Sequence, residues 1–320
     1  MKSVESIKTF PTNSPKLKMS PDIGDSFWSE ITVNLDFSII GAPKSATTWL
    51  FSCMIKHPRI FIPGEQNFFT IHQEKGPKYY NDLYRGHKHH VKGDYSNTYM
   101  IDENLPQCFF AKWPKMKIIM VSRNPVDRAF SHYLMEVRRG TIKPEKTNFI
   151  DVLKEPITYS FYDNGLYYKH LKKFMKFFPL ENIYVTTVDS ISTKPNQVLK
   201  DVFGLFNLHF PENFELPKIK NSYEVRKVNH QIQHLNENRI ISYTREKIKK
   251  YMPQNLIKIF SGIRNIIRLY LLKYNKVTYF IKKHNHLSRN LKYHLIELYR
   301  KDNTKLRYLF PKNNYDSWEF

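Results

Sequence analysis

Short apolar runs rich in β-branched and aromatic residues recur along the chain, and each is followed by a glycine, a proline or a polar residue. Such runs are typical of strands that are buried on both faces of a sheet. The most regular one is Lys117–Ser122, which reads Lys-Ile-Ile-Met-Val-Ser. The pattern predicts strands at residues 35–40, 59–62, 90–96, 117–122 and 182–188.

Between these runs, apolar residues recur every three or four positions, the spacing of one face of a helix. Asn124 and Pro125 supply an N-cap residue and a proline at the first helical position, and Gly140 provides a stop. Helices are predicted at residues 47–56, 105–113, 125–139, 164–178, 195–206 and 291–308. Strands that alternate with helices predict an α/β fold, with a central parallel sheet flanked by helices on both faces.

The chain has 320 residues, of which 41% are hydrophobic and 15% aromatic. This composition is sufficient for one large hydrophobic core. The first residues are rich in Pro, Ser, Asn and Lys and have no clear period. We therefore expect a loose N-terminal arm over residues 1–34 and a single domain over residues 35–320.

The formal net charge of +22 favours an anionic partner, which a nucleic acid, an acidic membrane surface or an anionic substrate could supply. The two cysteines, Cys53 and Cys108, are too few for a disulfide framework or a zinc cluster, so we expect no metal site. Without a signal peptide or an apolar run of membrane-spanning length, the chain is expected to be soluble and cytoplasmic.

One predicted strand ends in a small-residue loop that opens a helix, Gly41-Ala-Pro-Lys-Ser-Ala-Thr-Thr48. Backbone N–H groups in such a loop bind anions, and Lys44, Ser45, Thr47 and Thr48 add a positive charge and hydroxyl donors. The loop lacks the second glycine of a Walker A motif, which disfavours a Mg-dependent nucleotide or small-molecule kinase. An ordinary strand–helix turn with a chance lysine stays open at this point.

The segment Pro43-Lys-Ser-Ala-Thr-Thr-Trp49 resembles the 5′-phosphosulfate loop of sulfotransferases that use PAPS (3′-phosphoadenosine 5′-phosphosulfate). Ala46 stands where that family usually has glycine, and alanine restricts positive φ. The resemblance implies that residues 44–49 hold the 5′-phosphosulfate and that PAP (3′-phosphoadenosine 5′-phosphate) is the product. It also implies a nucleotide-kinase-like layout, with the donor at the carboxyl ends of the strands.

A second motif, Ser122-Arg-Asn-Pro-Val-Asp-Arg-Ala-Phe-Ser131, resembles the element that binds the donor's 3′-phosphate in the same family. The resemblance assigns that role to Arg123 and Ser131, and a guanidinium suits phosphate because it can bind two oxygens at once. For Arg128 we favour a surface or helix-capping charge.

The acceptor side offers one candidate base. Glu65-Gln-Asn-Phe-Phe69 resembles the Glu-x-x-Phe-Phe element of the carbohydrate-modifying branch, in which the glutamate takes the acceptor's proton. The branch that acts on phenols and steroids uses a histidine near the third strand, and here Gly93–Tyr99 contains none. We therefore expect Glu65 to be the base and Lys44 to stabilise the leaving group. Tyr95 stands where the family has a lysine, and its role is left open.

Residues 247–292 contain 12 lysines and arginines and no acidic residue. This basic segment could contact an acidic membrane, hold an anionic acceptor, or form a packed helical pair with a solvated face.

The sequence thus predicts sulfuryl transfer to a hydroxyl or amine, with a glycan or glycolipid favoured. A lipid headgroup or small molecule stays open as the acceptor. A kinase and a basic nucleic-acid-binding module are the alternatives, although no nucleic-acid motif is present.

Overall fold

The computed structural model describes residues 24–88, 90–143, 146–154, 161–217 and 287–318. The chain divides into two compact units. The larger consists of Met1–Ala129, Leu153–Lys218 and Arg289–Phe320, and the smaller of Phe130–Val152 and Ile219–Ser288. The larger unit contains the whole sheet.

Five strands form the sheet in the order β2-β3-β1-β4-β5, and every neighbouring pair is parallel. Their bounds are β1 Phe37–Gly41, β2 Ile60–Phe61, β3 Val91–Tyr95, β4 Lys117–Ser122 and β5 Ile183–Thr187. Each strand lies within a run that the sequence predicts or extends it by one residue. The predicted parallel α/β fold is therefore confirmed, with the anion loop after the central strand β1.

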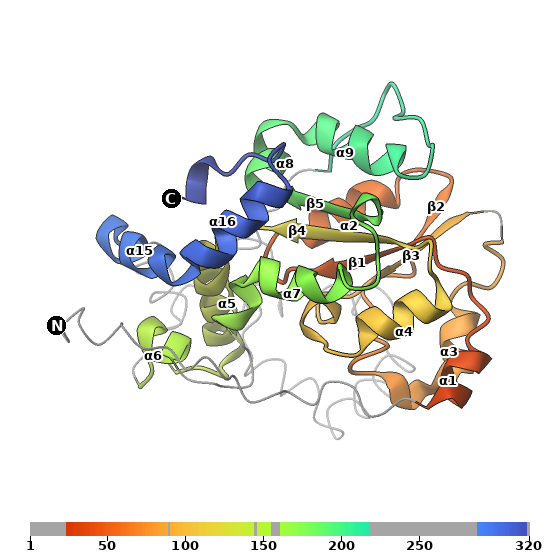
Figure 1. The fold of residues 1–320 in the computed structure, drawn as a ribbon, viewed down its shortest axis with the longest axis horizontal. Helices are drawn as coiled ribbons and strands as arrows, with labels where there is room; N and C mark the ends of the chain where they lie inside the picture. The colour runs from red at the N-terminus through yellow and green to blue at the C-terminus, as the bar shows by residue number, and fades with distance from the viewer. Residues whose placement is uncertain (1–23, 89, 144–145, 155–160, 218–286, 319–320) are drawn as a thin grey trace, which may run out of the picture. The chain divides into compact units, whose positions relative to one another are not determined.

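Helices cover both faces of this sheet (Figure 1). One face carries α2 (Thr47–Met54), α8 (Val188–Thr193) and α9 (Pro195–Gly204), and the other carries α4 (Leu105–Lys112) and α7 (Tyr167–Phe174). The remaining described helices are α1 (Asp25–Glu30), α3 (Gly76–Asp82), α5 (Pro125–Arg139), α6 (Phe149–Lys154), α15 (Arg289–Ile296) and α16 (Arg300–Leu309).

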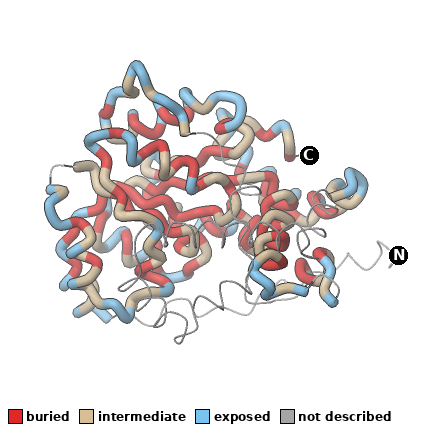
Figure 2. The backbone as a smooth tube through the Cα atoms, turned by 180° about the vertical axis from the view of Figure 1, so that it is seen from behind, coloured by how far each residue is buried: buried red, intermediate tan, exposed pale blue. Residues whose placement is uncertain are grey.

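The core forms two layers, one on each side of the sheet, and the strands between them are among the most continuously buried segments (Figure 2). Successive side chains of a strand point to opposite faces. In β4, Ile118 and Met120 therefore join the cluster beneath α4 and α7, whereas Ile119 and Val121 join the one beneath α2 and α9. Burial on both faces explains why the strands are continuous apolar runs rather than alternating ones.

The described part of the segment expected to be a loose arm is packed. Helix α1 lies next to the core, where the Trp28 ring stacks on Phe69 with 4.9 Å between centroids. Ile31 is fully buried, and the Trp113 indole donates a 2.9 Å hydrogen bond to the carbonyl of Val33. The expectation of a loose arm is wrong for residues 24–34, because their apolar side chains and backbone groups have partners in the domain.

Local signals predict some helix ends well. Asn124 Oδ1 accepts hydrogen bonds from the N–H groups of Val126 and Asp127, so the predicted N-cap of α5 is confirmed. Helix α3 was not predicted. The predicted amphipathic helix over residues 291–308 consists of α15 and α16 with a short 3₁₀ turn, Glu297–Tyr299, between them.

Most of the basic segment 247–292 lies outside the described residues. Its last residue, Lys292, pairs with Asp127 Oδ2 at 3.2 Å. Within the described ranges, no helix is both long and apolar enough to cross a bilayer.

Candidate functional site

The loop between β1 and α2 has the backbone geometry of an anion site. Lys44 and Ala46 both adopt left-handed conformations, with φ of 69° and 60°. Ala46 is the N-cap residue of α2, so the first N–H groups of the helix have no acceptor within it. Alternating left-handed residues and a helix N-terminus together turn backbone N–H groups toward an anion. Ala46 thus takes the conformation for which the family's glycine is suited.

The loop side chains differ in how far they are exposed. Thr48 is exposed and Lys44 half-buried, whereas Ser45, Thr47 and Trp49 are buried. Trp49 belongs to the core cluster on the α2 face of the sheet. Of the loop side chains, Lys44 and Thr48 are therefore the most accessible to a ligand.

Arg123 lies directly beside this loop. Its Nη1 donates a 3.3 Å hydrogen bond to the carbonyl of Lys44, although 79 residues separate the two in sequence. The contact follows from the sheet, because β1 and β4 are parallel neighbours and both segments leave at their carboxyl ends. The chain changes direction from one side of the sheet to the other between these strands, and ligands bind α/β sheets at such a crevice.

Tyr167 at the start of α7 holds the backbone of Arg123. The phenol hydroxyl donates a 2.7 Å hydrogen bond to the carbonyl of Arg123, and its oxygen accepts a 3.3 Å hydrogen bond from the backbone N–H of Arg123. Burial raises the pKa of Tyr167 to about 12, so the phenol stays neutral and keeps both contacts. Sequence reasoning placed this tyrosine on a helix but gave it no role.

Arg128 is fully buried, and its Nη2 donates to the carbonyl of Phe161. The interpretation of Arg128 as a surface or capping charge is therefore wrong. Burial lowers its pKa, and its Nε and Nη1 atoms have no hydrogen-bond partner among the described residues. Ser131, three residues further along α5, is half-buried and belongs to the smaller unit.

Glu65 follows β2 and lies next to the end of β3. It pairs with Tyr95 through an isolated parallel bridge, and the N–H of Gln66 donates to the Tyr95 carbonyl at 3.0 Å. The Glu65 carboxylate is exposed, and its Oε1 accepts a 3.0 Å hydrogen bond from Asn97 Nδ2. The structure therefore brings the expected base close to the strand end beside the anion loop.

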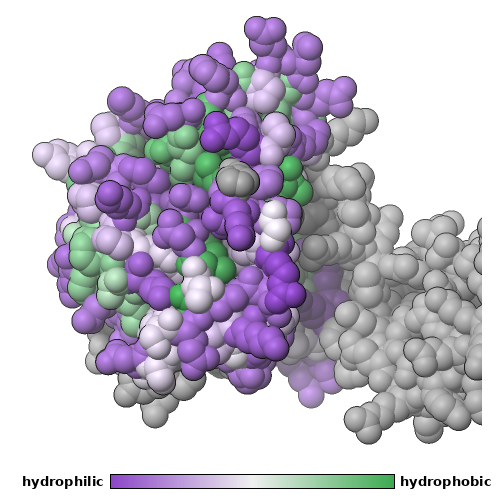
Figure 3. Space-filling view, turned by 90° about the vertical axis from the view of Figure 1, so that its right-hand side faces the viewer, coloured by the Kyte–Doolittle hydropathy of each residue, from purple (hydrophilic) through white to green (hydrophobic). Residues whose placement is uncertain are grey.

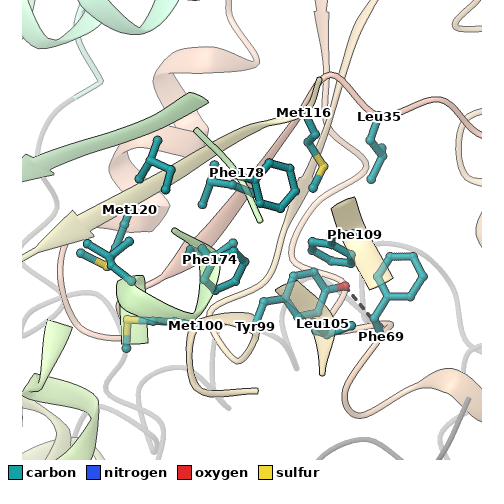
Figure 4. Packing of buried hydrophobic residues seen from close by; sticks show 14 of the residues in the cluster. Leu35, Phe69, Tyr99, Met100, Leu105, Phe109, Met116, Met120, Phe174 and Phe178 are labelled. Atoms are coloured by element: carbon teal, nitrogen blue, oxygen red, sulfur yellow. Dashed lines mark hydrogen bonds between the residues drawn. The ribbon is translucent and has the colours of Figure 1, made fainter. Parts of the chain in front are cut away.

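The two phenylalanines after Glu65 fix this segment to the core. Phe68 and Phe69 are fully buried, and the backbone N–H of Phe69 donates to the hydroxyl of Tyr99 at 3.2 Å (Figure 4). Tyr99, in the 3₁₀ turn Tyr99–Ile101, and Phe109 of α4 both pack against the Phe69 ring. The Glu-x-x-Phe-Phe pattern thus places an exposed carboxylate on a segment that two buried phenylalanines anchor in the core.

Tyr95 and Asn97 connect the two halves of the site. The Tyr95 hydroxyl lies 3.2 Å from Thr47 Oγ1 and 3.1 Å from Thr48 Oγ1, and it accepts from Asn97 Nδ2 at 3.2 Å. Burial raises the pKa of Tyr95, and the charge of Glu65 adds to the rise. The sequence placed Tyr95 where the resembled family has a lysine, at the end of a predicted strand, but gave neither Tyr95 nor Asn97 a role.

Figure 3 shows one face of the molecule in space-filling form. Among the described residues on this face, hydrophilic side chains predominate and apolar residues form small, separate patches. A face of this kind offers polar and charged contacts rather than an extended apolar docking surface.

Residues 35–263 match the family model described as the sulfotransferase domain. The chain belongs to the sulfotransferase family. Human heparan sulfate glucosamine 3-O-sulfotransferase 5 is 27% identical over 182 residues, which cover 53% of this chain and 52% of the relative. The human 3-O-sulfotransferase 3B1 is 26% identical over 223 residues, covering 65% and 56%. The chain thus spans about half the length of the curated relatives that it matches.

Solved structures of sulfotransferases are also similar. The enzyme from Alicyclobacillus acidocaldarius has a TM-score of 0.49 and 23% identity, covering 66% of this chain and 96% of that one. Mouse sulfotransferase SULT7A1 complexed with PAP has a TM-score of 0.42 and 20% identity, covering 58% and 63%. The kinase and nucleic-acid-binding alternatives gain no support from the comparisons.

Proposed function

We propose that this protein is a PAPS-dependent sulfotransferase that moves a sulfuryl group to a hydroxyl or amine of a glycan. Family membership supports the reaction class. The observation that carries the proposal is the contact between Arg123 and the Lys44 carbonyl, because it joins the two predicted donor elements at one end of the sheet.

The residues present fit a donor with two anionic ends. The loop of Lys44 and Ala46 offers N–H groups, an ammonium and the Thr48 hydroxyl for the 5′-phosphosulfate. Arg123, positioned by Tyr167, offers a guanidinium for the 3′-phosphate. Ser45, Thr47 and Trp49 support the loop from within the core in this proposal.

The proposed reaction needs one proton transfer and one substitution at sulfur. Glu65 takes the proton as the acceptor oxygen or nitrogen bonds to sulfur. The bond from sulfur to the 5′-phosphate oxygen breaks, and its electron pair leaves on that oxygen to give PAP. Lys44 and the loop N–H groups stabilise the negative charge that develops there.

The relatives support a glycan acceptor, since they are named heparan sulfate glucosamine 3-O-sulfotransferases. A contact between residues 247–292 and an acidic membrane remains part of the proposal, as does a cytoplasmic location.

Calorimetry with PAP tests the donor assignment directly. We expect the full chain to bind PAP at micromolar concentration, and Arg123→Ala to weaken binding by about 10- to 100-fold because a charge-assisted contact is lost. Arg85→Ala is the matched control, since Arg85 is an exposed arginine that pairs with Asp82. Absence of PAP binding by the wild-type protein would contradict the proposal.

Adenosine 5′-phosphosulfate, which lacks the 3′-phosphate, separates the two anionic ends. The wild-type protein should bind it more weakly than PAPS, and Arg123→Ala should bind both ligands about equally. If Arg123→Ala weakens both ligands to the same extent, Arg123 does not contact the 3′-phosphate.

A further inference from the structure

The hydroxyl of Tyr95 lies at the centre of a hydrogen-bond chain that runs from the anion loop to Glu65. Two loop threonines contact it from α2, at 3.2 Å for Thr47 and 3.1 Å for Thr48. On its other side, the amide nitrogen of Asn97 donates to Tyr95 at 3.2 Å and to Glu65 Oε1 at 3.0 Å. The two ends of the chain carry the groups proposed to hold the donor and to deprotonate the acceptor.

The number of available hydrogens determines which atoms of this hydrogen-bond chain donate and which accept. The Asn97 amide has two hydrogens, and Tyr95 and Glu65 receive one each. The Tyr95 oxygen therefore acts as an acceptor toward Asn97, and its single hydrogen remains available for one threonine oxygen. That threonine then keeps its own hydrogen for an anion. Replacing the phenol by any group without a hydroxyl breaks the chain in the middle.

Both central residues are held in place. The Tyr95 ring is 2% exposed and stacks on Phe51 of α2 with 5.3 Å between centroids. The Asn97 Oδ1 atom is buried and has no hydrogen-bond partner among the residues that the structure describes, so within them the amide orientation depends on the two bonds that Nδ2 donates. Loss of the Tyr95 oxygen would leave only the exposed Glu65 carboxylate to hold the amide.

We propose that Tyr95 and Asn97 are positioning residues that fix the Glu65 carboxylate relative to the hydroxyls of the donor loop. This inference rests on the proposed sulfotransferase function. Geometry of this kind matters for transfer rates, because small misplacements of a base relative to the reacting bond slow the reaction strongly. It contributes little to donor affinity, since the loop N–H groups, Lys44 and Arg123 are unchanged.

The test compares Tyr95→Phe, Asn97→Ala and the double variant with the wild-type protein. Turnover is followed as sulfuryl transfer from PAPS to heparan sulfate chains, and as release of inorganic sulfate from PAPS, where water replaces the acceptor. We expect each single variant to lower kcat by about 10- to 100-fold, with the Kd for PAP within about threefold of wild type. The double variant should lose little more than either single one, because both changes break the same chain.

Tyr79→Phe is the matched control. Its hydroxyl donates to Gln66 Oε1 at 3.3 Å, next to Glu65 in sequence but outside the chain, so its kcat should stay at the wild-type level. A kcat within about threefold of wild type for Tyr95→Phe, or losses that multiply in the double variant, would overturn the positioning role. Failure of the wild-type protein to bind PAP would instead contradict the proposed function.

Discussion

The hydroxyl of Tyr80 donates a 2.5 Å hydrogen bond to Oδ2 of Asp94, and both residues are fully buried. Asp94 lies in β3, directly before Tyr95, and its Oδ1 accepts from Ser96 at 2.8 Å. Ser96 in turn accepts from the N–H of Asn67 at 2.9 Å. The buried Asp94 carboxyl is thus connected, through the Ser96 hydroxyl, to the backbone of the segment that carries Glu65.

Burial raises the pKa of Asp94 to about 6 from its ordinary value of 3.8, although three hydroxyl donors oppose the shift. The folded state therefore holds this proton more tightly than the unfolded chain. The stabilisation is fully present below pH 4 and is lost as the pH rises through 6. Because Asp94→Asn removes this titration, the wild-type stability minus that of the variant should fall by about 2 kcal/mol between pH 4 and pH 7.

Urea unfolding at several pH values measures this difference. Asp302, whose pKa burial also raises to about 6, titrates in both proteins and cancels in the comparison. Two parallel curves of unfolding free energy against pH would mean that Asp94 does not titrate in this range.

The conformation of Ala46 predicts a stabilising substitution. A left-handed backbone costs an L-residue about 1–2 kcal/mol, and glycine avoids that cost. Ala46→Gly should therefore raise the free energy of unfolding by up to about 1 kcal/mol, after the extra entropy of glycine in the unfolded chain is subtracted. Ala111→Gly, on an exposed position of helix α4, should lower it by about 1 kcal/mol. Chemical denaturation of both variants checks the opposite signs, and equal losses would exclude strain at Ala46.

The sequence alone was sufficient to predict those elements that one local pattern determines. Continuous apolar runs predicted the five strands, and Asn124-Pro125 predicted the start of α5, because burial on both faces and capping depend on a few neighbouring residues. The meeting of Lys44 and Arg123 could also be predicted, since both follow strands and parallel strands end at the same edge.

What could not be predicted depends on contacts between distant segments. Tyr95 reaches Thr47 and Thr48 only because β3 lies beside β1 in the sheet, an order that no local pattern encodes. Arg128 was expected to be a surface or helix-capping charge, whereas it is fully buried, which is rare for arginine. Residues 24–34 look loose in sequence, yet α1 packs on aromatic residues that follow later in the chain.

Arg128 is a buried cation, and two of its three side-chain nitrogens have no hydrogen-bond partner within the described part of the chain. Replacing a buried charge with an apolar side chain of similar size is often neutral or stabilising, because its desolvation cost disappears. Arg128→Met should therefore leave the free energy of unfolding within about 1 kcal/mol of wild type or raise it. Arg128→Ala, which also removes packing, should be less stable than Arg128→Met by about 2–5 kcal/mol. Thermal and urea unfolding measure both, and a large loss for Arg128→Met would indicate that the charge is compensated in the fold.

Glu65→Gln tests the proposed base without disturbing its surroundings. In the wild-type protein, Glu65 Oε1 accepts a 3.0 Å hydrogen bond from the Asn97 amide. The glutamine oxygen can still accept this bond, but glutamine cannot take a proton from the acceptor substrate. Turnover should fall by about 10²- to 10⁴-fold, the usual effect of losing a general base. The Kd for PAP should not change, because Glu65 lies at the end of the Tyr95 hydrogen-bond chain that faces the acceptor substrate and not the donor.

Glu74→Gln is the control, since Glu74 is an exposed glutamate nine residues after Glu65 in the sequence and pairs only with His72 among the described residues. Turnover retained in Glu65→Gln would exclude Glu65 as the base, whereas equal losses in both variants would indicate a general effect of charge.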